Sequence, residues 1–329
     1  MNRATQLLAA CLAALLCSAG LPAQESPPTD PESRPVMVAC FLSDVRDIDD
    51  AGRTVELDLY VRLRWQDDSL CHDGPGPRIM DTRDAWHPAL QVLDDVSLRR
   101  HFDETLEVAP DGAVQWRQRF TGSISFAADY ADFPFDEHRL PLRFVGVPSS
   151  PPARFVLDED GGATLRDPDL FSIPNWSIAD PHVEIERFQA LGREAPAFTV
   201  SFRAARNPGF YVWKLLVPLC LVVMMSWSAF WVDPSHVGPQ ISVSVTSMLT
   251  LIAFRLSISY LVPNLPYLTR LDGFMLGATL LVLLALGEVV WTSRLTDAGA
   301  VDRARIIDRR GRVVFPIAFV GLISFTLIW

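Results

Sequence analysis

The spacing of apolar residues changes near residue 207, and this change divides the chain into two parts. Before it, short stretches alternate apolar and polar positions between clusters of Gly, Pro, Asp and Ser. Alternation with a period of two predicts strands that have one buried and one solvated face. After it, long apolar segments predict helices that cross a membrane. We therefore expect a β domain over residues 36–207 and a helical membrane domain over residues 208–329.

The β domain contains several predicted strands and no helical period of useful length. Residues 55–65 alternate apolar and charged side chains throughout. The other predicted strands cover residues 37–42, 114–120, 140–145 and 197–202. Strands at this spacing, separated by clusters such as Asp-Gly and Asp-Gly-Gly, predict an all-β sandwich of the immunoglobulin-like type.

The membrane domain is predicted to be an all-α bundle of four spans, with tryptophans near the span ends. The spans cover residues 210–231, 240–262, 271–291 and 313–329. Tryptophans in such places are typical of membrane interfaces, and here they are Trp213, Trp227, Trp231, Trp291 and Trp329. Six arginines between residues 294 and 312 predict that the connection between the third and fourth spans is cytoplasmic. The C-terminus is then expected outside.

The N-terminus has the pattern of a secretory signal. Arg3 precedes an apolar run over residues 7–16, and small residues continue to Ala23, so residues 1–23 are expected to be a signal peptide. Residues 24–35 are rich in Pro, Ser and Glu, which predicts a disordered lead-in.

Composition excludes several classes of function. A formal net charge of -10 argues against nucleic acid as a partner. No combination of nucleophile and base, phosphate-binding loop or metal-ligand spacing appears, so we expect neither an enzyme nor a cofactor nor a metal site. Of the cysteines, only Cys40 and Cys71 lie where a disulfide could form, and their spacing does not require one.

The second span carries an unusual number of hydroxyl side chains for a lipid-facing helix. At ~100° per residue, six of its positions fall within roughly 40° of one line along the helix. These positions are Ser242, Thr246, Leu249, Ala253, Leu256 and Tyr260. Small hydroxyls followed by leucines are what a pore-lining helix would present, with the leucines able to stop ions by dewetting. The alternative is a buried bundle helix whose serines bond to its own carbonyl groups.

Several motifs, in this order, resemble the pentameric ligand-gated (Cys-loop) channel superfamily. In chain order they are Trp-His-Pro-Ala-Leu at residues 86–90, Asp-Phe-Pro-Phe-Asp-Glu-His at 132–138, Arg-Asn-Pro at 206–208, Ser-Trp-Ser at 226–228, Met-Leu-Thr at 248–250 and Leu-Pro-Tyr at 265–267. The pattern is most similar to the bacterial amine-gated branch. The family's two loop cysteines would fall at Phe126 and Leu140, so this chain resembles the prokaryotic members that lack them.

The resemblance implies a homopentamer in a bacterial inner membrane, with the β domain in the periplasm and the second span around the pore. Leu249 would be the hydrophobic gate, and small inorganic ions would pass. The predicted pore mouth is Gly238, Pro239 and Gln240, with no carboxylate nearer than Asp233. Acidic residues 158–160 of the outer domain favour cations. An anion-selective channel of the same family remains the alternative.

The resemblance also assigns a coupling apparatus between the two domains. Phe133, Pro134, Phe135 and Asp136, with the turn at residues 47–50, would press on the linker at residues 262–271, which contains Pro266. Asp136 and Arg206 are expected to form an ion pair there. The alternative is that the motif is simply a packed turn.

The ligand site implied by the resemblance is an aromatic cage between subunits, suited to a cationic amine. Its candidate residues are Tyr60, Trp116, Arg119, Trp176, Phe188 and Phe198. Each aromatic residue could instead belong to the sandwich core. Protons are the other candidate ligand, since exposed carboxylates and His138 can titrate. Outside this family, a non-conducting membrane sensor with a β-sandwich domain is the remaining alternative. A transporter is not expected, because the spans show neither inverted repeats nor paired breaks.

Overall fold

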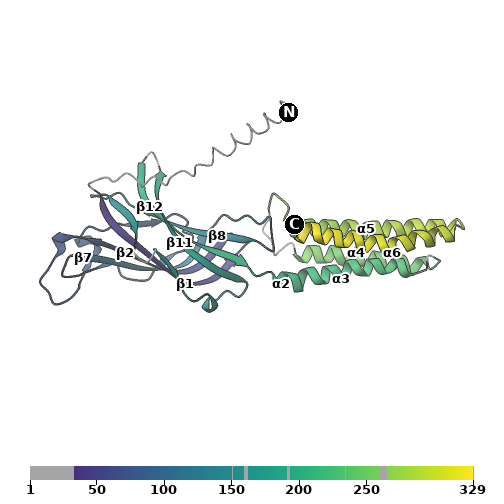
Figure 1. Ribbon diagram of the computed structural model, residues 1–329, viewed down its shortest axis with the longest axis horizontal. Coiled ribbons are helices and arrows are strands. Elements are labelled where there is room, and N and C mark those ends of the chain that lie inside the picture. The colour runs from purple at the N-terminus through teal and green to yellow at the C-terminus, as the bar shows by residue number, and fades with distance from the viewer. Residues whose placement is uncertain are drawn as a thin grey trace, which may run out of the picture.

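The computed structural model describes residues 33–149, 151–158, 162–190, 193–233, 235–258 and 265–328, and it shows an elongated molecule of two parts. The strands form one end and the long helices form the other, and they meet at α2 (Gly209–Tyr211) (Figure 1). The predicted signal peptide lies outside the described residues.

The β domain consists of two sheets. The larger has the order β10-β1-β2-β7-β6-β3, with β9 paired to β1 and β5 to β7, and the smaller has the order β11-β12-β8-β4. Their bounds are β1 (Arg34–Asp49), β2 (Thr54–Gln66), β3 (Arg78–Asp81), β4 (Leu90–Val92), β5 (Arg99–Arg100), β6 (Thr105–Val108), β7 (Ala113–Ser125), β8 (Glu137–Gly146), β9 (Ala153–Leu157), β10 (Ala163–Leu165), β11 (Trp176–Ala190) and β12 (Arg193–Arg206).

All five predicted strands lie within observed ones, namely β1, β2, β7, β8 and β12. Strand β2 follows the alternation closely, because Leu57, Leu59 and Leu63 are buried. β1 begins at Arg34, inside the segment expected to be a disordered lead-in, because it pairs with β9 in parallel. Strand β11 was not predicted, since Pro181 and several charged residues interrupt its apolar pattern and shift its register with β12.

The sandwich core is aromatic where the two sheets meet. The rings of Phe144 and Phe198 stack with centroids 4.9 Å apart, and Phe155 meets Phe198 edge-on at 5.0 Å. Cys40 is buried and Cys71 is exposed, and both are free thiols. The possible Cys40–Cys71 disulfide is therefore absent, because one cysteine lies in the core and the other at the surface.

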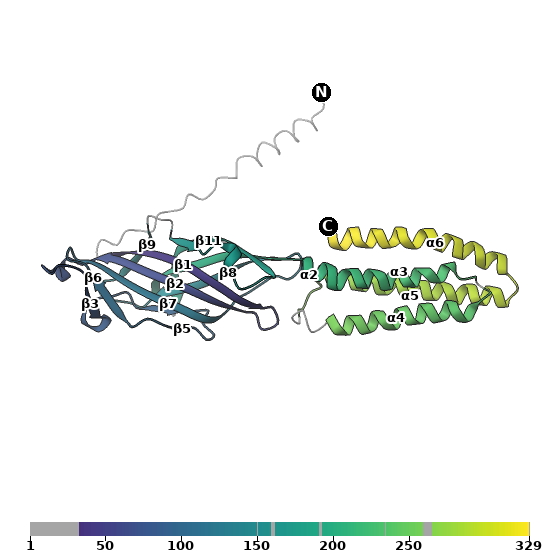
Figure 2. The same cartoon turned by 90° about the horizontal axis from the view of Figure 1, so that it is seen from below.

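Four helices of the described chain are long and apolar enough to cross a membrane. The first is built from α2, the π-helical turn η4 (Val212–Leu216), α3 (Val217–Ser228) and η5 (Ala229–Trp231). The others are α4 (Val237–Ile258), α5 (Arg270–Asp297), and α6 (Val301–Ile323) extended by η6 (Ser324–Ile328). In Figure 2, α4 and α6 lie on opposite sides of the bundle, with α3 and α5 between them.

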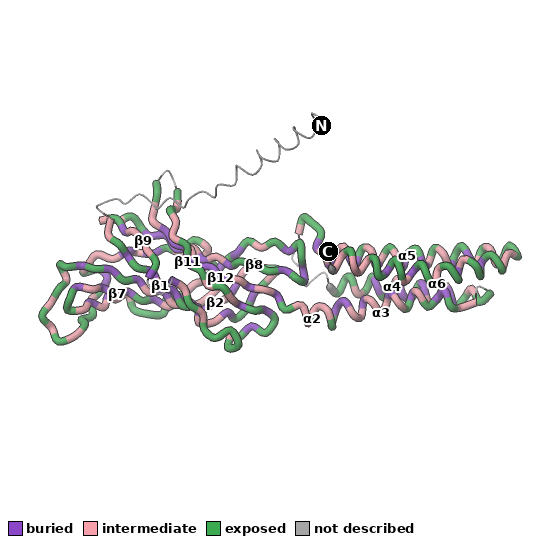
Figure 3. Tube along the Cα trace, viewed as in Figure 1, coloured by how far each residue is buried: buried purple, intermediate pink, exposed green. Residues whose placement is uncertain are grey.

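The fourth helix begins twelve residues before the predicted span. The arginines from Arg303 to Arg312 therefore lie on its first turns, and only residues 298–300 connect α5 to α6. Ala304 and Asp308 of this stretch are buried against the bundle. The burial pattern in Figure 3 places exposed residues along the outer faces of the helices. The exposed tryptophans Trp213, Trp231 and Trp291 lie near helix ends.

Candidate functional site

The turn that carries the Phe-Pro-Phe-Asp motif joins the sandwich to the helices. Its Phe133 side chain is fully buried, and the Phe133–Pro134 peptide bond is cis. The carbonyl of Phe133 accepts a hydrogen bond from the amide of Leu271, 3.2 Å away, and the carbonyl of Ala131 accepts one from Arg270, 2.9 Å away. The turn therefore satisfies free amides at the start of α5, where a helix has no internal partners for them.

Arg206, the last residue of β12, is held by two carboxylates. Its Nε and Nη2 donate to Asp136 at 2.7 and 3.0 Å, and its Nη1 and Nη2 donate to Asp50 at 2.8 and 2.9 Å. The Arg206 side chain is only 1% exposed. The ion pair between Asp136 and Arg206 expected from sequence is confirmed. Such bidentate contacts are among the stronger hydrogen bonds in proteins.

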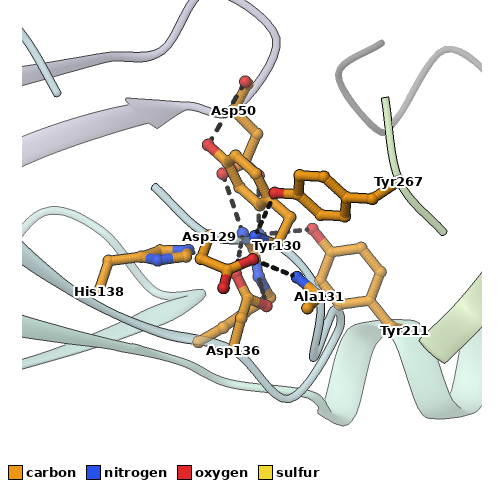
Figure 4. Close-up of polar contacts among 9 residues, drawn as sticks. Asp50, Asp129, Tyr130, Ala131, Asp136, His138, Tyr211 and Tyr267 are labelled. Carbon is orange, nitrogen blue, oxygen red and sulfur yellow. Dashed lines mark hydrogen bonds and ion pairs between the residues drawn. The ribbon is translucent and has the colours of Figure 1, made fainter. Parts of the chain in front are cut away.

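Aromatic rings complete the surroundings of Arg206. The guanidinium lies 4.1 Å from the ring centre of Trp176 and 4.9 Å from that of Phe133. Its Nη1 also donates to the Tyr211 hydroxyl of α2, 3.1 Å away. Figure 4 shows Asp50, Asp136 and Tyr211 approaching this point from the β1–β2 turn, the start of β8 and the first membrane helix. One arginine thus connects three elements from both domains.

Electrostatics keeps this cluster charged despite its burial. Burial opposes the charge on Arg206, but the hydrogen bonds to Asp136 and Asp50 outweigh it, so the pKa of Arg206 lies above its usual value. Burial likewise opposes ionisation of Asp136, but hydrogen bonds from His138 and Arg206 hold the pKa of this carboxyl below its usual range. His138 Nε2 lies 2.6 Å from Asp136 Oδ2 and is itself buried.

The linker before α5 touches the same turn. The Tyr267 hydroxyl accepts a hydrogen bond from the amide of Tyr130, 3.0 Å away, as Figure 4 shows. The Tyr130 hydroxyl points the other way and donates to the carbonyl of Asp50 at 3.5 Å. Pro266, next to Tyr267, is exposed. The described part of the linker therefore reaches the sandwich through a tyrosine pair, whereas residues 259–264 lie outside the described chain.

The pore-helix stripe lies on the exposed side of α4. Five predicted positions, Ser242, Thr246, Leu249, Ala253 and Leu256, are exposed, and Tyr260 lies outside the described residues. Ser244, Ser247 and Leu251 occupy the buried side. Ser247 and Thr250 donate to the carbonyls four residues earlier, as the alternative reading of the serines expected. Thr250 is exposed, so hydroxyl groups bond to the helix's own carbonyls on both sides of α4.

The predicted pore mouth requires one correction. Gly238 and Pro239 are exposed, but Gln240 is fully buried inside the subunit. Its amide nitrogen donates to the carbonyls of Ala229 and Val232 at 3.2 and 3.1 Å. Gln240 therefore closes the turn between η5 and α4, and its side chain does not face a central pore.

Three predicted ligand-site aromatics also require correction. Phe198 and Trp116 belong to the sandwich core, because their side chains lie on the inward-facing side of β12 and β7. Trp176 is buried at the domain junction under Arg206. Burial within the subunit leaves these three rings unable to form a cage between subunits. Their positions follow the core alternative rather than the ligand-site prediction.

The remaining predicted ligand-site residues reach the surface. Tyr60 of β2 and Phe188 of β11 are half-buried. Arg119 lies with its guanidinium 5.2 Å from the centre of the Tyr60 ring and donates from Nε to Asp58 at 2.9 Å. Tyr60 also borders a cavity of about 400 Å³ between Phe41 and Phe102. The structure brings Tyr60 and Arg119 together, with Phe188 on the other sheet.

Sequence reasoning missed an acidic pair in the membrane helices. Glu288 of α5 and the fully buried Asp308 of α6 lie at the end of the bundle remote from the sandwich. The sequence did contain a signal, because an acid such as Glu288 inside an apolar span is uncommon. Tyr130, Tyr211 and Tyr267 of the junction carried no such signal.

Comparison with known proteins agrees with this architecture. The family model for the neurotransmitter-gated ion-channel ligand-binding domain matches residues 20–147, and the model for the transmembrane region of the same channels matches residues 215–300. A proton-gated ion channel of Gloeobacter violaceus is 24% identical over 300 residues, which cover 89% of this chain and 82% of that protein.

A vertebrate receptor subunit is similar over a shorter part of its own length. The gamma-aminobutyric acid receptor subunit beta-4 of Gallus gallus is 21% identical over 266 residues, which are 78% of this chain and 54% of that subunit. The two family models thus match the domains in their observed order, the sandwich through β8 and the membrane domain through α5. The chain belongs to the pentameric ligand-gated (Cys-loop-type) ion-channel family.

Proposed function

We propose that five copies of this chain form a homopentamer in which α4 lines a pore for small inorganic ions. The observation that carries this proposal is the two-faced character of α4. Leu249 and Leu256 are 62% and 64% exposed in the single subunit, while Ser244 and Ser247 are buried. Ser242 and Thr246 lie on the same exposed line as these leucines, where a lipid-facing line would be apolar throughout, so this line suits a closed ring of helices around a narrow path.

Leu249 is the proposed gate. A ring of leucines around a narrow path excludes water and ions until the helices separate. The hydroxyls of Ser242 and Thr246 lie on the same exposed line, toward the end remote from the sandwich. They would replace part of the hydration of an ion that has passed the gate.

The junction around Arg206 is the proposed coupling element. Arg206 ends β12, and its partners Asp50 and Asp136 come from the two turns that face the membrane domain. The turn after Tyr130 also contacts the amides of Arg270 and Leu271 at the start of α5. A ligand that shifts β12 would move this cluster, which then displaces α5 and the linker that follows α4.

The ligand is proposed to bind between subunits beside Tyr60, Arg119 and Phe188. Arg119 already covers the Tyr60 ring and is paired with Asp58, so an amine would compete with a resident cation there. A proton is the second candidate. It is supported by the similarity to a proton-gated channel and by the many carboxylates of the outer domain.

For ion selectivity we keep the cation preference, with an anion channel as the alternative. The acidic residues of the outer domain support a cation preference less than the sequence suggested, because Asp158 is buried and paired with Arg62 at 2.8 Å. Residues 159–161 lie outside the described chain. The arginines at the remote end of the bundle favour a cytoplasmic position for that end and a periplasmic position for the sandwich, in a bacterial inner membrane.

The test of the pore is Leu249→Ser in the full chain, reconstituted in liposomes. A hydroxyl ring at the gate should hold water, so ions should leak without any ligand. The matched control is Leu284→Ser, since Leu284 is 60% exposed but lies on α5. This control should leave the liposomes tight.

Two outcomes would contradict the proposal. If liposomes with Leu249→Ser did not leak ions, a non-conducting sensor would be favoured. If Leu284→Ser leaked equally, the leak would not be specific to α4. Reversal potentials of the leaking variant in asymmetric salt give the sign of the permeant ion without an agonist.

A further inference from the structure

The remote end of the helix bundle contains a buried polar cluster that the proposed channel mechanism does not use. It consists of Gln240 of α4, Glu288 of α5 and Asp308 of α6, and the buried Ser244 follows Gln240 by four residues on α4. Gln240, Ser244 and Asp308 have no exposed surface, and the carboxyl oxygens of Glu288 are buried as well. Three helices therefore bring two acids and one neutral polar side chain together inside the bundle.

Most of the oxygen atoms in this cluster lack partners among the described residues. Both carboxyl oxygens of Glu288, Oδ1 of Asp308, Oε1 of Gln240 and the hydroxyl of Ser244 accept or donate no hydrogen bond there. The one hydrogen bond to a carboxyl is long, from Gln240 Nε2 to Asp308 Oδ2 at 3.4 Å. Buried polar atoms are normally paired, so such an excess of acceptors indicates a missing donor.

Nearby charges do not supply that donor. Arg312 and Asp233 both act on Asp308, and their charges have opposite signs. Arg312 instead donates to the carbonyl of Phe230 at 2.9 Å, and its guanidinium lies over the Trp231 ring. From α4 Gln240 contributes to the cluster, and from α5 Glu288 does. Within the described chain, no ion pair reaches either acid.

Two adjacent buried carboxylates disfavour each other's charge, and one shared proton turns their repulsion into an O–H···O hydrogen bond. The side chains of Glu288 and Asp308 lie within hydrogen-bonding range of one another. We propose that Glu288 and Asp308 form a proton-binding site, and that Gln240 connects its occupancy to the start of the pore helix.

A proton fits this place better than a metal cation. Asp308 lines a cavity of about 160 Å³ together with Trp231, Asp233, Arg305, Arg309 and Arg312. A metal ion needs more ligands than the two carboxyl groups here provide, and no group of three or more His, Cys, Asp or Glu that could hold one occurs among the described residues, whereas a proton needs only two oxygens. The cavity thus gives Asp308 a route by which protons can arrive from water.

Gln240 is the link to the pore. Its amide nitrogen bonds to two carbonyls of the turn before α4 and to Asp308. Loss of the proton would strengthen the pull of the charged pair on this amide and weaken its hold on the turn. The exposed residues Gly238 and Pro239 directly precede Gln240, so the proposed pore mouth would move with it.

Infrared spectroscopy of the full chain in phosphatidylcholine liposomes tests the site without requiring conductance. A protonated carboxyl band should persist at neutral pH and disappear in Glu288→Gln and in Asp308→Asn. Asp302→Asn is the matched control, because Asp302 is an exposed acid on the same helix as Asp308, and it should keep the band.

Three results would overturn the proton site. The first is the absence of the band in the parent protein between mildly acidic and neutral pH, and the second is its survival in both cluster variants. The third is loss of the band when the choline salt in the buffer is replaced by a sodium salt, which would identify a metal cation as the occupant.

The link to the pore rests on the proposed function and has its own readout. On the Leu249→Ser background, ion flux should change with pH, and Glu288→Gln should remove this change while Asp302→Asn keeps it. Equal pH dependence in all three would overturn the link through Gln240. Absence of ion flux in Leu249→Ser would contradict the channel proposal but would not affect the infrared test of the proton site.

Discussion

Two buried clusters of charged side chains lie at opposite ends of the membrane domain, and they are built in opposite ways. At the junction with the sandwich, Arg206 makes four hydrogen bonds to Asp50 and Asp136. At the remote end, Glu288 and Asp308 face each other with no arginine bonded to either in the described chain. One cluster compensates its burial by pairing opposite charges, and the other has only neutralisation available to it.

The difference does not come from a lack of arginines near the remote cluster. Arg312 lies one helical turn after Asp308 on α6, at a spacing where ion pairs often form. The Trp231 ring and the Phe230 carbonyl hold its guanidinium elsewhere. Arg206, in contrast, ends a strand beside two turns that both present an aspartate. The position of the backbone, rather than composition, decides which acids receive a cation.

The strongest way to break the junction is Arg206→Ala. It leaves two buried carboxylates without their cation, which typically costs about 3–5 kcal/mol. We expect a large fall in the melting temperature of the detergent-purified protein and loss of ligand-evoked current. Arg203→Ala is the control, because Arg203 lies on the same strand but pairs with Asp180 and Glu137 at the surface. If both variants melted alike, the junction would not depend on its ion pairs.

Replacing one aspartate of each cluster by asparagine should change the stability of the protein in opposite directions. Asp136→Asn removes charge-assisted hydrogen bonds to Arg206 and should destabilise the protein by about 1.5–3 kcal/mol. Asp308→Asn places an N–H donor beside the Glu288 carboxylate, so stability should stay the same or rise. Thermal unfolding of both purified variants measures this difference, and equal destabilisation would remove the contrast between the clusters.

Acid should weaken the junction through Asp136. The folded-state pKa of Asp136 lies below its usual value of about 3.9. Its stabilising effect is therefore present above that pH and is lost as the pH falls toward the folded-state pKa. We expect the melting temperature to drop below about pH 4 in the parent and to drop less in Asp136→Asn. Parallel curves for the two proteins would show that another group dominates acid unfolding.

The smallest effect is expected from Tyr267→Phe. This change removes one hydrogen bond, from the amide of Tyr130 to the Tyr267 hydroxyl, at a half-exposed site. The cost should be about 0.5–1.5 kcal/mol. Melting temperature should barely change, while the agonist or proton concentration for half-activation should shift severalfold if the tyrosine pair transmits gating. An unchanged activation curve would remove Tyr267 from the coupling path.

Local patterns in the sequence determined much of this architecture. Period-two alternation located β2, and long apolar runs located the four helices, because both signals depend only on neighbouring residues. The motif at residues 132–138 led to the ion pair between Asp136 and Arg206, which the structure contains. The exposed stripe of α4 follows directly from helical geometry.

Tertiary structure decided which side of each element is enclosed. The family resemblance placed Phe198 and Trp116 at a ligand site, but both lie inside the sandwich, because alternation alone does not say which sheet face meets the core. Gln240 turned inward because the turn before α4 and the helix α6, far apart in sequence, both offer it hydrogen-bond acceptors. The pairing of Glu288 with Asp308 likewise depends on how α5 packs on α6, and no local pattern of residues contains that information.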